Sequence, residues 1–378
     1  GASTAQAGIL ENTPRFDYLG ATCPSLLLEP SRTNLVTQSE YFGSWDLSNA
    51  TITNNATTSP EGVDNASLYT SSNATNYVRE IITAANGTYT LSAFFKRDAT
   101  DNVRINLSDG VTGEIRYVFN LADETSTLTK SGGTISGYSA DFENYGNGWY
   151  RLHITATTNA GTAITAYFET DNETGSFYAY GAQLEAGSYA TSYIPTYGVS
   201  QTRAADVCYK TGISSLIGQS EGTLYAEFVA VQNSTFSDIA SLGTSGSNLV
   251  ELQFNGSSKY LTGVYYVLGG VAYITSLTAL TIGQTYKVAF AYKTNDFVMY
   301  LNGVQQGVDT SGTVVSGFSE ISLNGYGSAA NNAENAKVSQ ALVFKTRLSN
   351  LDLAILTGAT TYNTFAAMAL ALNYTVYE

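Results

Sequence analysis

Aromatic and guanidinium side chains recur at alternate positions of several predicted strands in the first half of the chain. Successive side chains of a strand point to opposite faces, so Phe94 should point outward from a run whose Leu91 and Phe95 face the core. The same rule turns outward a further set of polar side chains on nearby runs: Arg104, Asn106, Arg116, Asn120, Arg151 and His153. Aromatic faces next to planar hydrogen-bond donors suit a ligand with many hydroxyls, such as a glycan. If these strands share one sheet, its outer face is a candidate ligand groove.

Other interpretations of these residues remain open. The same face could be solvated charge or an interface between subunits. Trp45, in the stretch YFGSWD, could either anchor the core or stack on a ligand at a groove rim. The chain has 28 tyrosines, and most of them are expected to be core or strand-surface residues of a β-rich protein.

Catalytic constellations are missing from the sequence, which predicts that the protein is not an enzyme. His153 is the only histidine, and no G-x-S-x-G motif provides a nucleophile for it. Glycosidases need paired carboxylates, whereas Glu251 is followed two residues later by Gln253. The missing acids disfavour a polysaccharide lyase or hydrolase, but the plentiful tyrosine and arginine leave a Tyr/Arg lyase as an alternative.

Charge and composition exclude several classes of partner. Lys and Arg total 17 against 31 Asp and Glu, a net charge of −14, which disfavours nucleic acid. The sequence has no run of eighteen apolar residues, so membrane insertion is not expected. Cys23 and Cys208 lie far apart with no C-x-x-C motif, which argues against a zinc site and leaves open a disulfide or two free thiols.

Short alternating runs bounded by Gly, Asn and Asp predict an all-β protein made of two tandem antiparallel β-sandwiches, or jelly rolls. Asn302-Gly303 between two such runs predicts a type I′ hairpin. Short helices are expected only at the C-terminus, where Ser349 is a candidate N-cap and Gly358 a candidate stop. The predicted organisation is an extended segment 1–33, a jelly roll 34–195, a linker 196–220, a second sandwich 221–346 and a helical tail 347–378.

Four stretches carry a family resemblance: CPSLLLEPSRTNLVTQSEYFGSW, NGWYRLHITATT, YAYGAQLEAGSYATSYIPT and TRAADV. Together they resemble a module of bacteriophage tail-fibre and virion surface proteins, whose core is similar to jelly-roll carbohydrate-binding modules. The second half resembles a concanavalin A or laminin-G-like domain, through TYKVAFAYKTNDFVMYLNGV.

The resemblance implies a non-catalytic protein that binds a glycan or polysaccharide at a virion surface or another extracellular place. Its alternative is a structural assembly protein whose sandwiches are spacers that contact other virion proteins or form a homo-oligomer. Related jelly rolls often hold a structural calcium near the chain ends, and Asn34, Gln183 and Glu185 occupy roughly matching positions.

Overall fold

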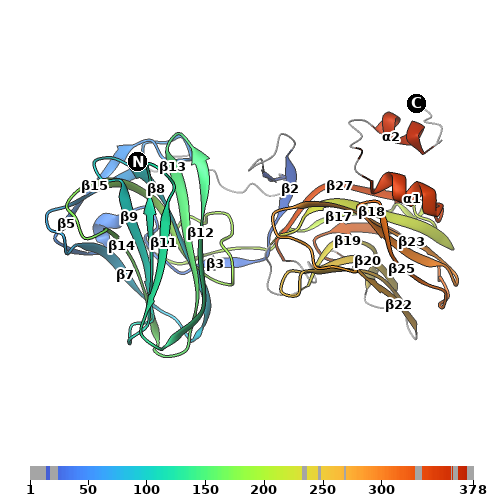
Figure 1. Ribbon diagram of the computed structural model, residues 1–378, viewed down its shortest axis with the longest axis horizontal. Coiled ribbons are helices and arrows are strands. Elements are labelled where there is room, and N and C mark those ends of the chain that lie inside the picture. The colour runs from blue at the N-terminus through green and yellow to red at the C-terminus, as the bar shows by residue number, and fades with distance from the viewer. Residues whose placement is uncertain are drawn as a thin grey trace. The chain divides into compact units, whose positions relative to one another are not determined.

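The computed structural model describes residues 14–17, 24–231, 236–245, 248–267, 270–327, 334–358, 360 and 365–372 (Figure 1). The chain divides into two compact units. Among the described residues, unit 1 is formed by Ser31–Ala204. Unit 2 is formed by the described residues of Ala205–Glu378 and of Gly8–Pro30. Both units are antiparallel β-sandwiches, which confirms the predicted all-β class.

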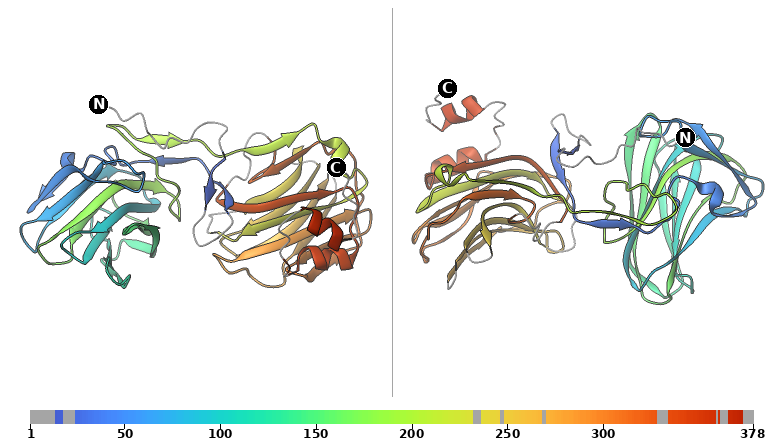
Figure 2. Two further views of the ribbon diagram at one scale, coloured as in Figure 1. Left: turned by 90° about the horizontal axis from the view of Figure 1, so that it is seen from above. Right: turned by 180° about the vertical axis from the view of Figure 1, so that it is seen from behind.

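Unit 1 contains two six-stranded sheets, seen face to face in Figures 1 and 2. Sheet 1 has the order β11-β10-β9-β14-β7-β4, with bounds β4 Asp46–Ser48, β7 Tyr77–Thr83, β9 Asn102–Ser108, β10 Glu114–Asn120, β11 Ser126–Ser131 and β14 Ala163–Thr170. Sheet 2 has the order β12-β13-β8-β15-β6-β5, with bounds β5 Ala50–Thr57, β6 Ala66–Ser71, β8 Gly87–Arg97, β12 Ile135–Gly146, β13 Trp149–Thr158 and β15 Ser176–Ala186. The remaining elements are the paired strands β3 Arg32–Asn34 and β16 Gln201–Arg203, and the 3-10 turn η1 Phe42–Ser44.

The core of unit 1 lies between these sheets. The inward face of β8 supplies Leu91, Ala93 and Phe95, as alternation predicts, and β9 supplies Val103 and Ile105. Burying such side chains contributes about 1.5–3 kcal/mol for each large aliphatic or aromatic residue. The hydrophobic pattern therefore determines which face of every strand is left for function.

Unit 2 packs a seven-stranded sheet 3, with order β1-β2-β27-β18-β23-β24-β25, against a six-stranded sheet 4, with order β17-β26-β19-β20-β21-β22. The strands of sheet 3 are β1 Phe16–Asp17, β2 Ser25–Leu28, β18 Glu221–Val229, β23 Thr285–Lys293, β24 Phe297–Leu301, β25 Val304–Asp309 and β27 Ala336–Phe344. Those of sheet 4 are β17 Cys208–Thr211, β19 Phe236–Ser245, β20 Asn248–Asn255, β21 Tyr260–Val267, β22 Gly270–Thr275 and β26 Glu320–Leu323. The turn η2 Ser214–Leu216 follows β17.

The local signals in unit 2 behave as the sequence predicts. Asn302 and Gly303 have φ of 48° and 81° at the β24–β25 turn, the positive values that a type I′ turn requires. The helix α1 Asn350–Leu356 begins after Ser349, whose side chain accepts a hydrogen bond from the Asp352 amide. A second helix, α2 Phe365–Ala371, contributes Met368 to the cluster that α1 forms with sheet 3.

The boundary between the units, after Ala204, lies inside the predicted linker 196–220, but both this linker and the predicted N-terminal segment contain paired strands. Residues 196–220 contain β16, which pairs with β3 in unit 1, and β17, which pairs with β26 in unit 2. Within the predicted extended segment, β2 pairs with β27 of the second sandwich. Backbone pairing with distant strands gives both segments structure that their Gly-, Ser- and Pro-rich composition conceals. Cys23 lies outside the described residues, and Cys208 is half-buried in β17.

Candidate functional site: a groove on sheet 1

Strand register brings polar and aromatic residues of sheet 1 into one row on its outer face. Tyr167 on β14 lies opposite Arg79 of β7 on one side and Asn106 of β9 on the other. Asn106 in turn lies opposite Arg116 of β10. Directly opposed residues have Cβ atoms about 4.5–5.5 Å apart, so the four side chains form a continuous strip across the sheet.

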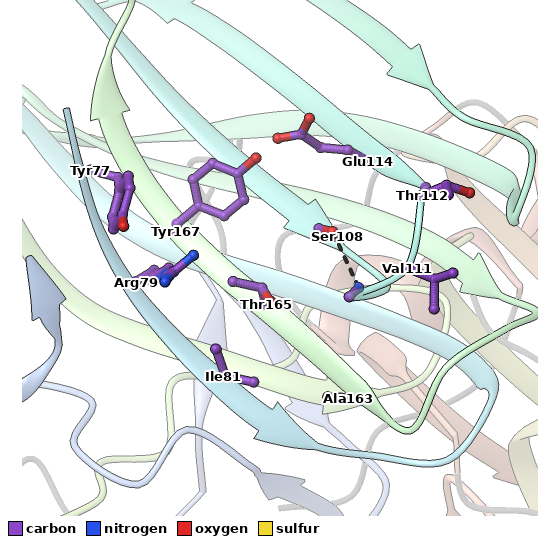
Figure 3. A pocket seen from close by; sticks show the side chains of 12 residues that line it. Tyr77, Arg79, Ile81, Ser108, Val111, Thr112, Glu114, Ala163, Thr165 and Tyr167 are labelled. Atoms are coloured by element: carbon purple, nitrogen blue, oxygen red, sulfur yellow. Dashed lines mark hydrogen bonds between the residues drawn. The ribbon is translucent and has the colours of Figure 1, made fainter. Parts of the chain in front are cut away.

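A groove of about 590 Å³ opens on this face. Its walls and floor come from β7, β9, β10, β14 and the turn after β9, and the lining residues are Tyr77, Arg79, Ile81, Ser108, Gly110, Val111, Thr112, Gly113, Glu114, Ala163, Thr165 and Tyr167. Figure 3 shows Tyr167 rising from the central strand of the floor, with Tyr77 and Arg79 to one side and Glu114 to the other. Ile81 is 60% exposed, so this part of the face is uncovered.

One end of the groove is framed by the tight turn of residues 109–113. The Asp109 carboxylate accepts hydrogen bonds from the amides of Val111, Thr112 and Gly113 at 2.9–3.2 Å. Burial raises the pKa of Asp109, but the hydrogen bonds from Thr134 and these amides outweigh it, so the pKa lies below its ordinary value.

The same turn requires glycine where the chain approaches itself. A Cβ atom on Gly113 would lie 2.7 Å from the Asp109 carboxylate and equally close to Ile135. Gly110, whose amide donates to the Ser108 hydroxyl at 3.2 Å, has a φ of 70°. The sequence SDGVTG therefore fixes the shape of this groove end.

Arg104 is half-buried beside the strip in an ion pair. Its Nε donates to Glu169 Oε1 at 2.7 Å and its Nη2 lies 2.6 Å from Glu169 Oε2, a bidentate contact. The Asn106 amide donates to the same carboxylate at 2.6 Å. Burial lowers the pKa of Arg104, but the ion pairs with Glu169 and Asp171 raise it by more, so the net shift is upward. The guanidinium therefore stays charged and fixed.

Arg79 links the groove to the edge of sheet 1. Its Nε donates to Asp46 Oδ2 at 2.7 Å, and its guanidinium lies 4.7 Å from the centre of the Tyr77 ring. The contact with Tyr77 is a cation–π interaction. It holds Arg79 over one face of that ring and leaves Tyr167 as the second aromatic surface of the groove.

The predicted single ligand face is corrected by the pairing of the strands. Arg104 and Arg116 lie on sheet 1, whereas Phe94, Arg151 and His153 lie on sheet 2, where Phe94 is directly opposite Arg151. Strands that are close in sequence do not all join the same sheet, because β8, β12 and β13 belong to sheet 2 whereas β9, β10 and β11 belong to sheet 1. The outward directions were predicted correctly, but they are directions from two different outer faces.

The sheet 2 residues are also covered. Phe94 is 4% exposed and Arg151 2% exposed. Arg151 Nη2 donates to the Thr191 carbonyl at 2.7 Å, and the Tyr193 ring meets Phe94 edge-on with 6.2 Å between ring centres. Residues 191–194, which we call the covering segment, therefore occupy the position that a ligand would need.

Close backbone approach keeps the covering segment in place. Gly181 in β15 has a φ of 61°, and a Cβ atom there would lie 3.1 Å from Phe94 and 3.2 Å from Tyr193. Glu40 Oε1 accepts hydrogen bonds from the hydroxyls of Tyr180 and Tyr193 at 3.3 and 3.2 Å. The outer face of sheet 2 is thus a second, small core.

His153 is half-buried on the same face, opposite Asp141 of β12 and Ser92 of β8. Burial lowers the pKa of His153, and the nearby Arg151 lowers it further, against the opposing charges of Glu143 and Asp141. At neutral pH the ring is therefore uncharged.

Trp45 belongs to the core of unit 1, which decides between the two roles predicted for it. It is 6% exposed and packs edge-on against Phe42, with 5.2 Å between ring centres, and against Phe168 at 5.4 Å. Its indole N–H donates to the Gln38 carbonyl at 3.0 Å. A tryptophan so enclosed cannot stack on a ligand.

The three residues expected near calcium form a hydrogen-bonded cluster instead. The Gln183 amide donates to Glu185 Oε1 at 2.7 Å, and Thr191 donates to both carboxylate oxygens of Glu185. The Asn34 amide donates to the carbonyls of Ala182 and Ile194. Donors thus occupy the oxygens that calcium would need, so this set does not fit the ion. Within the described ranges no group of three or more His, Cys, Asp or Glu could hold a metal.

A second carboxylate reaches Glu251 from a neighbouring strand, which sequence spacing along β20 does not reveal. Burial raises the pKa of Glu251 to about 8, and the charge of Asp238 on β19 adds to the shift. Glu251 is 4% exposed and Asp238 is fully buried. Because neither carboxyl is open to solvent, the pair has no access to a polymeric substrate in this structure.

No family model matches the sequence, and no curated protein sequence is similar to it. Several solved structures show distant similarity. The CBM40 module of the Ruminococcus gnavus IT-sialidase has a TM-score of 0.35 and 13% identity, covering 39% of this chain and 91% of its own. The leech intramolecular trans-sialidase has a TM-score of 0.33 and 16% identity, covering 38% of this chain and 24% of its own. A heptameric SAP-like pentraxin from Limulus polyphemus has a TM-score of 0.32 and 16% identity, covering 38% of this chain and 72% of its own.

The groove contains residues that the predicted set lacks, namely Tyr77, Arg79 and Tyr167. A signal for Tyr167 is present, because Ile164, Ala166 and Phe168 in the same strand face the core and alternation turns Tyr167 outward. Nothing in the sequence pairs that strand with β7. No helix among the described residues has the length and apolarity to cross a membrane.

Proposed function

We propose that the chain is a non-catalytic glycan-binding protein and that the groove on sheet 1 is its binding site. The observation that carries the proposal is an uncovered groove of about 590 Å³ in which Tyr167, Tyr77, Arg79 and Glu114 converge. Ligand sites are concave surfaces with apolar or aromatic area and a few placed polar groups. This groove has that composition on a rigid sheet.

The chemistry of the lining suits a glycan. Tyr167 offers a flat apolar face with a polar tip, against which the C–H side of a sugar ring can pack. Arg79 and the hydroxyls of Ser108 and Thr165 can donate to sugar oxygens, while the Glu114 carboxylate accepts from sugar hydroxyls. The groove is partly open to solvent, which leaves room for a sugar that belongs to a longer chain.

The lining supports binding without hydrolysis. Glycosidases place two carboxyl groups about 5–9.5 Å apart around the scissile bond. Glu114 is the one carboxylic acid among the twelve residues that line the groove in the described part of the chain. We expect no release of reducing ends or unsaturated products from polysaccharides.

We also propose that this binding takes place at a virion surface or another extracellular location, where the ligand is a host or matrix polysaccharide. Support comes from the resemblance of the four quoted sequence stretches to tail-fibre modules.

Isothermal titration calorimetry of the full chain against ligands found on a glycan array tests the site. Tyr167→Ala should weaken binding at least tenfold, about 1.4 kcal/mol, because a central aromatic contact is lost. Tyr273→Ala is the matched control, since Tyr273 is an exposed tyrosine of β22 in unit 2 and its loss should leave affinity unchanged. Weaker binding in Tyr273→Ala with unchanged binding in Tyr167→Ala would place the site in unit 2. Absence of glycan binding by the unchanged chain would refute the proposal.

A structural assembly role is the second candidate, favoured by a different observation. Leu351 of α1 is 70% exposed and Leu370 of α2 is 77% exposed. Large exposed apolar side chains on neighbouring helices mark surfaces that other chains can cover. Sedimentation of the full chain and of the Leu351→Glu variant distinguishes this role, which requires an oligomer that the variant weakens.

A further inference from the structure

The arginines on the outer face of sheet 1 are already paired with carboxylates of the same face. Each pair has a distance of 2.6 or 2.7 Å between nitrogen and oxygen: Arg79 with Asp46, Arg104 with Glu169, and Arg116 with Glu114. Arg104 has Asp171 as a further partner at 3.2 Å. The face thus carries three positive and four negative charges.

An anionic sugar would therefore meet no unpaired guanidinium on this face. Its carboxylate or sulfate could reach the remaining N–H groups of Arg79 or Arg116 only by lying beside Asp46 or Glu114, the acid that each guanidinium already pairs with. Like charges at such distances oppose binding, and the net charge of −14 on the chain opposes approach as well. Arg104, with its side chain 12% exposed, already pairs with both Glu169 and Asp171.

Two oxygen acceptors on the same face have no hydrogen-bond donor. They are Oε1 of Glu114, which lines the groove, and Oδ1 of Asn106, which is buried next to the Tyr167 position. Both oxygens are enclosed by the protein, so Glu114 acts on a ligand in the groove through its negative charge and not through Oε1. Sugar hydroxyls donate hydrogen bonds, whereas carboxylate and sulfate oxygens only accept them.

We propose that the groove selects neutral, hydroxyl-rich glycans and discriminates against carboxylated, sulfated or sialylated ones. A sugar ring packs on Tyr167, while the Glu114 carboxylate repels an anionic substituent and holds Arg116 in an ion pair. Glu114 is the residue that determines specificity. This inference rests on the proposed glycan-binding function.

Matched ligand pairs test the selectivity on the intact chain. The probes are lactose against α2,3-sialyllactose, and galactan against polygalacturonan, titrated at 50 and 500 mM NaCl. We expect the neutral member of a bound pair to bind at least tenfold more tightly, with less than a twofold change between the two salt concentrations, since no ion pair with the ligand forms.

The Glu114→Gln variant sharpens the test. It removes the negative charge and releases Arg116, so the affinity ratio of neutral to anionic ligand should fall at least threefold. Glu221→Gln is the control, because Glu221 is also paired with a cation, Lys293 at 3.1 Å, but in unit 2. The affinity ratio of neutral to anionic ligand in Glu221→Gln should match that of the unchanged chain.

Each outcome has one meaning. Tighter binding of the anionic member, lost in Tyr167→Ala, would overturn the selectivity and leave the groove as the glycan site. An unchanged ratio in Glu114→Gln would remove Glu114 from its role and overturn the inference. No binding of any neutral or anionic probe, in these pairs or on a glycan array, would overturn the proposed function and the selectivity together.

Discussion

The two outer faces of unit 1 carry similar residues, but one face is open and the other is covered. Sheet 1 presents Arg79, Tyr77 and Tyr167 around an open groove, and sheet 2 presents Arg151, Phe94 and further aromatic residues beneath the covering segment. Both faces combine guanidinium, carboxylate and aromatic groups. A segment that follows β15 in the chain folds back over one face and leaves the other open. Residue composition on a strand therefore predicts the direction of a side chain, and its availability to a ligand depends on what covers it.

The largest expected difference between the faces concerns arginine. Arg151→Ala should lower the free energy of unfolding of unit 1 by about 3–5 kcal/mol, because it strips a buried network of its cation. The carbonyl of Thr191 and the hydroxyl of Ser92 would lose their donor. Arg116→Ala on the open face, where the side chain is 45% exposed, should change it by no more than about 0.5 kcal/mol.

Urea denaturation of both variants, followed by circular dichroism, measures this comparison. Equal effects of the two substitutions would mean that the faces do not differ in the way the covering segment implies.

The turn that frames the groove is expected to have the next largest effect. Asp109→Ala should cost about 2 kcal/mol, because three amides lose one charged acceptor. The pKa of Asp109 is lowered in the folded state, so its contribution is complete above the ordinary value of 3.8 and is lost as the pH falls through the folded value. Glycan affinity should fall in the same variant, since the groove end loses its shape.

Thermal melting and calorimetry at pH 7 and at pH 3 measure these effects. Ser72→Ala, at an exposed position outside the groove, serves as a control. Unchanged glycan affinity in Asp109→Ala would show that the turn does not determine the shape of the groove.

The smallest expected effect is the titration of His153 on the covered face. Its pKa lies below the ordinary 6.5, so unfolded chains bind the proton more readily than folded ones. Stability is therefore complete above pH 6.5 and falls as the pH drops below it. His153→Gln should flatten the curve between pH 6.5 and 5, while glycan binding at the groove stays constant over the same range.

Melting temperatures at half-unit steps of pH measure the effect in the unchanged chain and the variant. A parallel fall in glycan affinity that His153→Gln abolishes would contradict the separation of the two faces.

Local rules fixed much of what could be predicted. Alternation correctly placed Leu91 and Phe95 in the core and Phe94 on the opposite side of β8. Positive φ values at Asn302-Gly303 and the hydrogen bond at Ser349 follow from the preferences of those residue types alone. These features depend on neighbours within a few residues, and the sequence therefore determines them directly.

Pairing between distant strands was decided only in the tertiary structure. Arg104 and Phe94 lie ten residues apart, yet they point from different sheets, because β8 pairs with β13 and β15 while β9 pairs with β10 and β14. Alternation has the same period on every strand and carries no information about which strands become neighbours. That choice is made by burial of both inner faces at once, and it alone brings Tyr167 beside Arg79 and places the covering segment over Arg151.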